Sequence, residues 1–181
     1  MSVLVDRLLA VHHALDAARF PHAFGGAIAL AYCTEEPRGT RDIDVNVFVD
    51  SHDAPRVLAA LPHEVTVEPG DIERAVTDGQ IRVWWEETPV DVFLDVHDFH
   101  SEAAAGVRIV PFAGEQIPVL GCTALVVFKA FFDRTKDWAD IEAIIEAGTL
   151  DVAPALGWLV VLLGPDHAAT ARLAALVRAD G

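Results

Sequence analysis

Hydrophobic and polar positions repeat along the chain with two periods, one typical of helices and one typical of strands. Residues 2–19 carry apolar side chains at helical spacing, which predicts a helix that Pro21 ends. Residues 81–85 and 90–96 are rich in β-branched and aromatic side chains around a turn at 87–89, which predicts a hairpin. The chain is therefore expected to begin with a helix and to have a strand hairpin near its middle.

The same reading extends to the rest of the chain. Further helices are predicted over residues 27–33, 54–61, 72–76, 124–133, 133–147 and 168–179. Further strands are predicted over residues 22–24, 43–49, 65–67, 107–112 and 117–120. Residues 156–163 are apolar throughout and fit either a helix or a buried run. His97 and His100 are interpreted as loop residues, because no zinc-ligand spacing accompanies them.

Two carboxylates stand at the start of the strand predicted over residues 43–49. Asp42 and Asp44 are two positions apart, so their side chains point to one face, about 7 Å apart at their Cα atoms. Like charges on one face repel unless a cation lies between them. Oxygen ligands of this kind suit Mg²⁺, which binds through one or two carboxylates together with substrate phosphates. A solvent-facing strand edge is the alternative interpretation of the pair alone.

A glycine pair lies upstream of this strand and changes the balance between the two interpretations. Gly25 and Gly26 precede an alanine-rich helix, where glycines let the backbone approach a ligand and leave N–H groups free for phosphate. The combination of Gly25-Gly26, a helix, and then Arg38-x-Thr40-x-Asp42-x-Asp44 resembles the core signature of the nucleotidyltransferase superfamily, the polymerase-β-like fold. Within it, the chain resembles short bacterial proteins of the AbiEii/MenT-like toxin group.

This resemblance covers roughly residues 20–147 and implies an α+β fold. It predicts a nucleotidyltransferase-like mixed β-sheet flanked by helices, with C-terminal helices. The catalytic core is expected over residues 1–120, and a C-terminal helical part over residues 121–181 is expected to pack on it as a single compact unit.

The resemblance also implies a third carboxylate on a strand next to the first two. Asp91 best matches that position, and Asp95, which shares its face, is the fallback. Three carboxylates can hold two divalent ions about 4 Å apart, an arrangement that activates an attacking oxygen and stabilises the leaving pyrophosphate. The predicted metal ligands are therefore Asp42, Asp44 and Asp91, with Mg²⁺ as the cofactor.

Further site residues follow from the resemblance alone. Lys129 is expected to contact nucleotide phosphates, and Asp137 on the following helix to complete the catalytic site. The alternatives are a lysine lying along a helix surface and an acidic residue favoured at a helix N-terminus. The expected nucleotide-binding residues are Gly25, Gly26, Arg38, Thr40 and Lys129.

Composition limits the substrates that such a site would take. The net charge of −15, from 13 basic and 28 acidic residues, repels nucleic acid and makes a large RNA or DNA footprint unfavourable. A local basic patch of Arg38, Arg41, Lys129, Arg134 and Lys136 would still allow an RNA end to dock. No run of about 18 uncharged apolar residues predicts a membrane span. Cys33 and Cys122 fit no metal spacing and are expected to be reduced thiols in a cytoplasmic protein.

The predicted function is Mg²⁺-dependent transfer of an NMP, for example from ATP, to a hydroxyl acceptor. An RNA end, a protein or a small molecule would serve as the acceptor. The AbiEii/MenT-like resemblance makes the toxin of a toxin–antitoxin pair, with an antitoxin protein as partner, one form of this hypothesis. The alternatives are a small-molecule nucleotidyltransferase of the antibiotic type and a non-catalytic nucleotide-binding module of the same fold.

Overall fold

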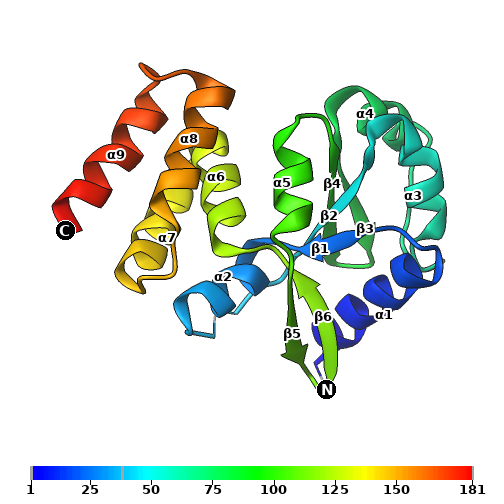
Figure 1. The fold of residues 1–181 in the computed structure, drawn as a ribbon. Coiled ribbons are helices and arrows are strands. Elements are labelled where there is room, and N and C mark those ends of the chain that lie inside the picture. Colours follow the sequence, from blue (N-terminus) through cyan, green and yellow to red (C-terminus); the bar gives the residue numbers. More distant parts are fainter. Residues whose placement is uncertain (1, 38, 181) are drawn as a thin grey trace. The chain divides into compact units, whose positions relative to one another are not determined.

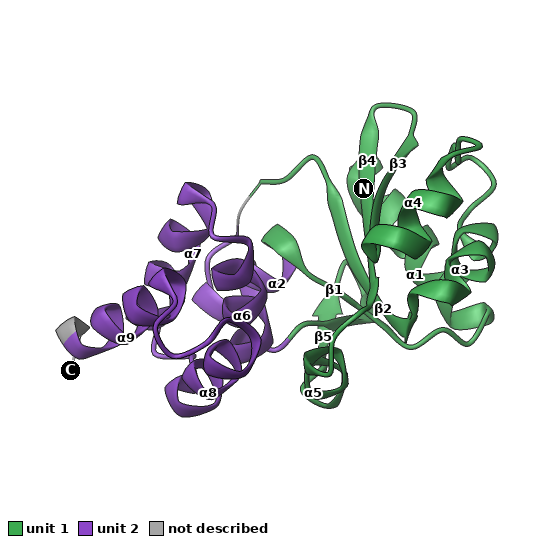
Figure 2. Cartoon of the chain, turned by 90° about the horizontal axis from the view of Figure 1, so that it is seen from above, with its two compact units in different colours: residues 1–27, 39–120 green, residues 28–38, 121–181 purple. Residues whose placement is uncertain are grey.

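The computed structural model describes residues 2–37 and 39–180, and within them it has two compact units (Figures 1 and 2). Unit 1 comprises residues 1–27 and 39–120, and unit 2 comprises residues 28–38 and 121–181. The chain therefore passes into unit 2 for a short excursion before it returns to complete unit 1. That the two parts form one compact unit stays a prediction.

Unit 1 is built on a mixed sheet that has six strands among the described residues. They are β1 (His22–Phe24), β2 (Ile43–Asp50), β3 (Gln80–Trp85), β4 (Thr88–Asp95), β5 (Arg108–Phe112) and β6 (Glu115–Val119), in the order β3-β4-β2-β1-β6-β5. The β2–β4 and β1–β6 pairs are parallel, and the β1–β2, β3–β4 and β5–β6 pairs are antiparallel. Both predicted hairpins, β3–β4 and β5–β6, are confirmed, as is the mixed sheet flanked by helices.

Side chains alternate along the central strands of this sheet, so that one face of the sheet is apolar and buried. Buried residues alternate with half-buried ones along the whole of β4, so that Val90, Val92 and Leu94 point into the core. Val45 of β2 and Ile81 of β3 lie beside Val92 in the same row across the three strands. The intervening row carries charged residues, so the strand period itself places polar chemistry on the face opposite this core.

The helices of unit 1 pack around the sheet. They are α1 (Val3–Ala17), α3 (Ala54–Ala60), α4 (Asp71–Asp78) and α5 (Phe99–Ala105), and a 3₁₀ turn, η1 (Ser51–Asp53), precedes α3. The hydroxyl of Ser2 caps α1 by accepting a hydrogen bond from the Val5 amide at 3.4 Å. Helix α3 contacts both α1 and α4, and α5 contacts β2.

Unit 2 is helical. It contains most of α2 (Gly26–Thr34), which begins in unit 1, and α6 (Cys122–Phe132), α7 (Thr135–Glu146), α8 (Val152–Leu163) and α9 (Ala168–Asp180). Helix α6 packs against α7, α8 and α9, and Trp138 of α7 is 1% exposed within this bundle. The apolar segment 156–163, for which a helix and a buried run were both open, lies in α8. None of the described helices has both the length and the apolar character needed to span a membrane.

The expectation of reduced thiols at Cys33 and Cys122 is wrong. The two cysteines form a disulfide whose Cα atoms are 5.5 Å apart and whose residues are separated by 89 positions. Cys33 lies in the last turn of α2 and Cys122 is the first residue of α6, so the disulfide joins the end of one helix to the start of the other. The hydroxyl of Thr149 donates a hydrogen bond to the carbonyl of Cys33 at 2.7 Å, which holds the same turn of α2.

Two local predictions are also wrong. Residues 65–67 form no strand and contribute a single bridge between Thr66 and Trp84, because one pair cannot extend into a ladder there. His100 is not a loop residue but part of α5, where it is 5% exposed and lies 3.5 Å from an oxygen of Asp95. Burial lowers the pKa of His100 below its ordinary value.

Candidate active site

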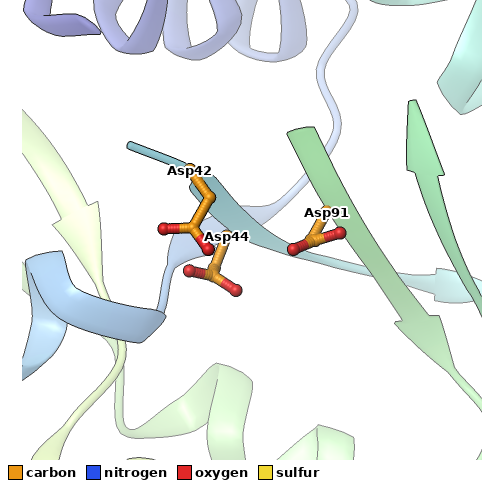
Figure 3. Close-up of side chains that lie close together, drawn as sticks. All are labelled: Asp42, Asp44 and Asp91. Carbon is orange, nitrogen blue, oxygen red and sulfur yellow. The ribbon is translucent and has the colours of Figure 1, made fainter. Parts of the chain in front are cut away.

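Three carboxylates converge in unit 1. Asp44 is the second residue of β2, Asp42 immediately precedes that strand, and Asp91 lies on β4 (Figure 3). Each is half-buried, and one oxygen of each lies within 4.8 Å of one oxygen of both others. The structure thus brings together the three residues that were predicted to bind a metal.

The register of the parallel β2–β4 pair explains this convergence. Asp44 and Asp91 are directly opposite one another, whereas Asp95 lies opposite Asp50 at the other end of the pair. Residues opposite one another on neighbouring strands place their side chains on the same face of the sheet. Asp91 rather than the fallback, Asp95, therefore faces the Asp42–Asp44 pair.

The donor set fits a hard divalent cation. Three carboxylates supply six oxygens and no nitrogen or sulfur, which is the chemistry that Mg²⁺ binds through its usual one or two carboxylates. Without a cation, Asp44 and Asp91 are like charges directly opposite one another, an arrangement that destabilises a sheet. A divalent ion held by Asp42, Asp44 and Asp91 would offset that repulsion.

The glycine pair approaches the same carboxylates. Gly26 has a φ of +49°, and a Cβ added to it would collide with the carboxylate of Asp44. A Cβ on Gly25 would lie 3.1 Å from the side-chain amide nitrogen of Asn46. The backbone N–H of Gly25 donates a hydrogen bond to the backbone carbonyl of Asp44 at 2.9 Å. Glycine is therefore needed for a close approach of the β1–α2 turn to Asp44. Because α2 begins at Gly26, the N–H group of this residue has no acceptor within the helix, and it lies close to Asp44.

The other expected phosphate-binding residues are placed less fully. Thr40 precedes β2, and its hydroxyl donates a short hydrogen bond to the carboxylate of Asp42. This contact orients one of the three carboxylates, a role that the sequence did not suggest. Arg38 lies outside the described residues.

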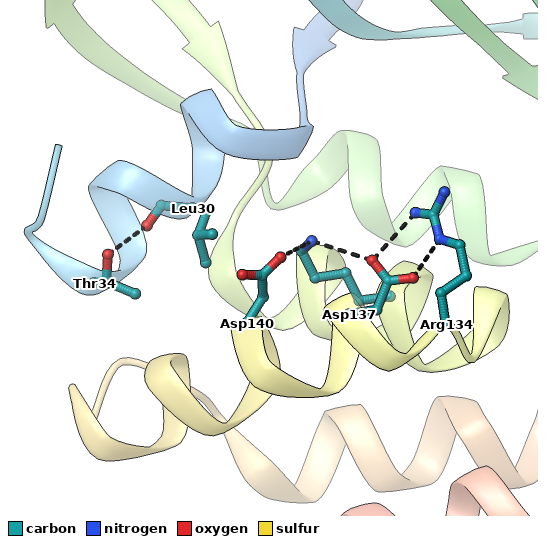
Figure 4. A network of polar contacts seen from close by, with 6 residues as sticks. Leu30, Thr34, Arg134, Asp137 and Asp140 are labelled. Carbon is teal, nitrogen blue, oxygen red and sulfur yellow. Dashed lines mark hydrogen bonds and ion pairs between the residues drawn. The ribbon is translucent and has the colours of Figure 1, made fainter. Parts of the chain in front are cut away.

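Lys129 and Asp137 belong to an ion-pair network within unit 2 (Figure 4). The ammonium of Lys129 lies 2.7 Å from an oxygen of Asp140 and 3.4 Å from an oxygen of Asp137. Arg134 donates two hydrogen bonds to Asp137, at 2.6 and 3.1 Å. Lys129 is 8% exposed, so the alternative of a lysine along a helix surface is wrong. These contacts also commit Lys129 and Arg134, two members of the suggested basic patch, to carboxylates.

The contacts of this network stabilise the ionised form of the Asp137 carboxyl. Burial by itself would raise the pKa of the Asp137 carboxyl, but the hydrogen bond from Arg134 and the charge of Lys129 outweigh it and leave the pKa below its ordinary value. Asp140 was missed in the sequence. A usable signal was its position three residues after Asp137 on one helix, which places both carboxylates on the same face.

Arg82 is a second residue that sequence reasoning missed. It lies on β3 directly opposite Asp91, and its guanidinium donates hydrogen bonds of 2.7 and 2.6 Å to the two carboxylate oxygens. The predicted hairpin turn at residues 87–89 would have paired Trp85 with Asp91. The turn actually lies at Glu86 and Glu87, with Glu86 at a φ of +52°, and this shift of register brings Arg82 to the site.

No protein-family model matches the chain, and no curated protein matches it in sequence. Solved structures do match. The structure of ANT(2″)-Ia in complex with adenylyl-2″-tobramycin aligns with 99% of this chain and 97% of its own, with a TM-score of 0.59 and 15% sequence identity. The solution structure of the same antibiotic-resistance factor aligns with 97% and 91%, at a TM-score of 0.57 and 16% identity. The lincosamide antibiotic adenylyltransferase LnuA, with lincomycin bound, aligns with 78% of this chain and 96% of its own, at a TM-score of 0.53 and 13% identity.

The chain has the nucleotidyltransferase fold. The fold implied by the resemblance of the residues between Gly25 and Asp44 is thus confirmed. Within this nucleotidyltransferase fold, membership of the AbiEii/MenT-like group stays a hypothesis, since the matched structures include antibiotic-modifying proteins.

Proposed function

We propose that the protein is a Mg²⁺-dependent nucleotidyltransferase that transfers an NMP from an NTP to a hydroxyl group. The observation that carries the proposal is the convergence of Asp42, Asp44 and Asp91 on one face of the sheet. Three clustered carboxylates repel one another, and the single positive charge of Arg82 beside Asp91 leaves an excess of negative charge that a divalent cation would offset. The nucleotidyltransferase fold of the chain supports the same assignment.

The residues have distinct tasks in this proposal. Asp42, Asp44 and Asp91 would hold Mg²⁺, which supplies positive charge for the triphosphate and the leaving pyrophosphate. The N–H group of Gly26 would bind a phosphate oxygen at the start of α2, whereas the predicted phosphate contact of the Gly25 N–H is not retained, because that group donates to the Asp44 carbonyl at 2.9 Å. Both glycines lie against Asp44, so the phosphates and the carboxylates would meet at one place.

Two further residues, Arg38 and Thr40, would complete the proposed nucleotide site. Arg38 would contribute a guanidinium to the phosphates, while Thr40 would hold Asp42 in its present orientation through the hydroxyl contact. The roles that the resemblance implies for Lys129 and Asp137 stay hypotheses, because the ammonium of Lys129 pairs with Asp137 and Asp140 within unit 2.

The transfer step breaks one bond and forms one bond. The acceptor hydroxyl oxygen bonds to the α-phosphorus as the bond from that phosphorus to the oxygen leading to the β-phosphate breaks. Pyrophosphate leaves, and the hydroxyl proton passes to a carboxylate oxygen of Asp91. The protein's contribution is alignment of the two oxygens and stabilisation of charge, which is how phosphoryl transfer is usually catalysed.

A small hydroxylated molecule is the acceptor class that we favour. ANT(2″)-Ia and LnuA were solved with an adenylylated tobramycin and with lincomycin, both small molecules. The net charge of −15 also disfavours a polyanionic acceptor at long range. An RNA end, as in the toxin hypothesis with its antitoxin partner, and a protein hydroxyl are the competing outcomes of the test.

The test uses each of the four NTPs with ³²P in the α-phosphate. The full-length protein is incubated with Mg²⁺ and, separately, total RNA, cell protein and a panel of aminoglycosides and lincosamides. Nucleotidyl transfer leaves the α-phosphate on the acceptor, whereas a kinase would move only the γ-phosphate. We expect label on a small molecule; label on RNA or protein would instead support the corresponding competing acceptor.

The Asp42→Asn/Asp44→Asn variant is expected to lose this labelling. A matched control, Glu73→Gln/Glu102→Gln, removes the same two charges from exposed positions on α4 and α5 and should retain it. Equal labelling by the site variant and the wild-type protein would contradict the proposed mechanism. No labelled acceptor, together with no stabilisation by any NTP, would favour the non-catalytic nucleotide-binding module.

A further inference from the structure

A row of three charged residues crosses three neighbouring strands of unit 1. Asp44 of β2 lies opposite Asp91 of β4, and Asp91 lies opposite Arg82 of β3. The rows before and after it are apolar, with Val83, Val90 and Ile43 in one of them. The charged row is therefore confined to the position where the carboxylates converge.

The contact between Arg82 and Asp91 is bidentate. Nε and Nη2 of Arg82 each donate to a different oxygen of Asp91, at 2.7 and 2.6 Å. A guanidinium that binds a carboxylate in this way fixes the plane of the carboxylate as well as its position. The Asp91 side chain is 15% exposed while that of Arg82 is 51% exposed, so the arginine covers Asp91 from the solvent side.

The charges of all three carboxylates act on the guanidinium of Arg82. Its hydrogen bonds to Asp91 come first among the causes that raise the pKa of its guanidinium, and the charges of Asp91, Asp42 and Asp44 add to them. Two other arginine–carboxylate pairs of unit 1, Arg56 with Asp53 and Arg74 with Asp71, join residues three apart, and a third, Arg7 with Glu86, joins α1 to the β3–β4 turn. The Arg82–Asp91 pair instead joins two strands at the site.

The contact leaves Asp91 able to take part in chemistry. A carboxylate has about four lone-pair positions, and Arg82 uses one on each oxygen. Arg82 therefore leaves a second position on each oxygen unused, and one oxygen of Asp91 lies within 4.8 Å of an oxygen of both Asp42 and Asp44. Arg82 thus restricts the direction in which Asp91 can act without blocking it.

We propose that Arg82 is the positioning residue of the acidic site: it holds the Asp91 carboxylate toward Asp42 and Asp44, and its positive charge balances the cluster against a divalent cation. This inference rests on the proposed function for its effect on turnover. Its effect on cation binding concerns the three carboxylates alone and requires neither nucleotide nor acceptor.

Two substitutions separate the two effects of Arg82. Arg82→Met removes both the charge and the hydrogen bonds, whereas Arg82→Lys retains the charge and loses the paired hydrogen bonds. Arg56→Met serves as the matched control, because Arg56 is exposed on α3, where it pairs with Asp53 and lies over the ring of Phe20. Binding of Mn²⁺ alone is measured by the electron paramagnetic resonance signal of the free ion, and turnover is measured by α-³²P transfer.

Arg82→Met is expected to bind Mn²⁺ about tenfold more tightly than the wild-type protein, the size of a unit charge acting on a divalent ion across a few ångströms in near-aqueous surroundings. The same variant should lose at least about tenfold in kcat, since a mispositioned catalytic group costs that much or more. Arg82→Lys should bind Mn²⁺ within about twofold of wild type, because the charge is retained, and should still lose kcat. Arg56→Met should change neither quantity.

Tighter cation binding with slower turnover is a combination that general structural damage would not produce. Mn²⁺ affinity of Arg82→Met equal to or weaker than that of wild type would overturn the assignment, as would an unchanged kcat. If Arg82→Met does not fold, the experiment uses Arg82→Gln instead, which removes the same charge. A wild-type protein that transfers no nucleotide would refute the proposed function, and the Mn²⁺ comparison would then decide the role of Arg82 by itself.

Discussion

Gly26 is packed so closely against Asp44 that the carboxylate occupies the space where any other residue would have its Cβ. The backbone at Gly26 is also left-handed, with a φ of +49°, which an L-residue with a side chain rarely adopts. The turn that begins α2 and the metal-ligand candidate on β2 are therefore matched in shape. Substituting the glycine tests this match directly.

Gly26→Ala is expected to destabilise the protein by about 1–3 kcal/mol, from the strain of a positive φ and from displacement of Asp44. Nucleotidyl transfer should fall by more than the fraction of unfolded protein explains. Urea unfolding and the α-³²P assay measure the two quantities. Gly157→Ala is the control: nothing lies within 4 Å of its Cβ position in α8, and the change should be neutral or stabilising. Wild-type behaviour of Gly26→Ala would contradict the packing described.

Mg²⁺ is expected to raise the melting temperature of the protein. A ligand that binds only the folded state at about ten times its Kd contributes about 1.4 kcal/mol, or roughly 3–6 °C for a chain of this length. Asp44→Asn should abolish the Mg²⁺-dependent part of the shift in melting temperature. Glu73→Gln, at an exposed position of α4, should retain it. Differential scanning fluorimetry with and without EDTA makes the comparison. An equal Mg²⁺ shift in Asp44→Asn would exclude this carboxylate as a ligand.

Asp137→Asn is expected to destabilise unit 2 by about 3 kcal/mol, because it removes one charge from a buried ion-pair network. Lys129 would remain buried with Asp140 as its carboxylate partner in the network. The exposed Asp166→Asn provides a control that should lie within about 0.5 kcal/mol of wild type. Chemical denaturation measures both, and a cost for Asp137→Asn no larger than that of the control would contradict the importance of the network.

The same network gives a dependence on acid pH. The pKa of Asp137 is lowered in the folded protein relative to 3.8, so the folded state binds its proton less readily than the unfolded state. The stabilisation from Asp137 is therefore present above pH 3.8 and is lost as the pH falls through the lowered folded value. Asp137→Asn should lack this part of the acid destabilisation, which denaturation at pH 5 and pH 3 would reveal.

A histidine pair in unit 1 predicts a second pH dependence. Nδ1 of His22 contacts the Phe20 carbonyl at 2.8 Å and so carries a proton, which makes Nε2 the acceptor for Nδ1 of His12 at 2.9 Å. Burial lowers the pKa of both histidines below 6.5. The stabilisation is thus present above pH 6.5 and decreases as the pH falls through the lowered folded values.

Substituting His22 tests this second dependence. His22→Leu should reduce the loss of the free energy of unfolding between pH 7.5 and pH 5. His63→Gln provides the control, because the side chain of His63 is 94% exposed and its loss should leave the pH dependence unchanged. Urea unfolding at both pH values measures the difference. An identical pH dependence in His22→Leu and wild type would mean that the pair does not contribute.

The sequence predicted those features that depend on local pattern. The period of apolar residues indicated α1 and both hairpins, and the spacing of Asp42 and Asp44 indicated a shared face. Asp91 followed from the resemblance, and its position opposite Asp44 depends on the parallel register of β2 and β4, which no local pattern determines. The roles of these residues stay predictions.

What the sequence did not predict depends on register and on contacts between distant segments. A hairpin turn predicted at residues 87–89 instead of 86–87 hid the pairing of Arg82 with Asp91. Asp140 was missed because its importance comes from Lys129 on a different helix. The disulfide between Cys33 and Cys122 joins residues whose separation of 89 positions gives no local signal.

The Cys33–Cys122 disulfide also makes the chain a covalent ring with two tails. All of β2 through β6 lies inside the ring, whereas β1 lies on the N-terminal tail and α7 to α9 lie on the C-terminal tail. In the chain-entropy model, closing a loop of this length lowers the entropy of the unfolded chain and so raises its free energy by about 4–5 kcal/mol. A single protease cut between residues 34 and 121 would leave both fragments joined, so the cleaved chain would separate on a gel only after reduction.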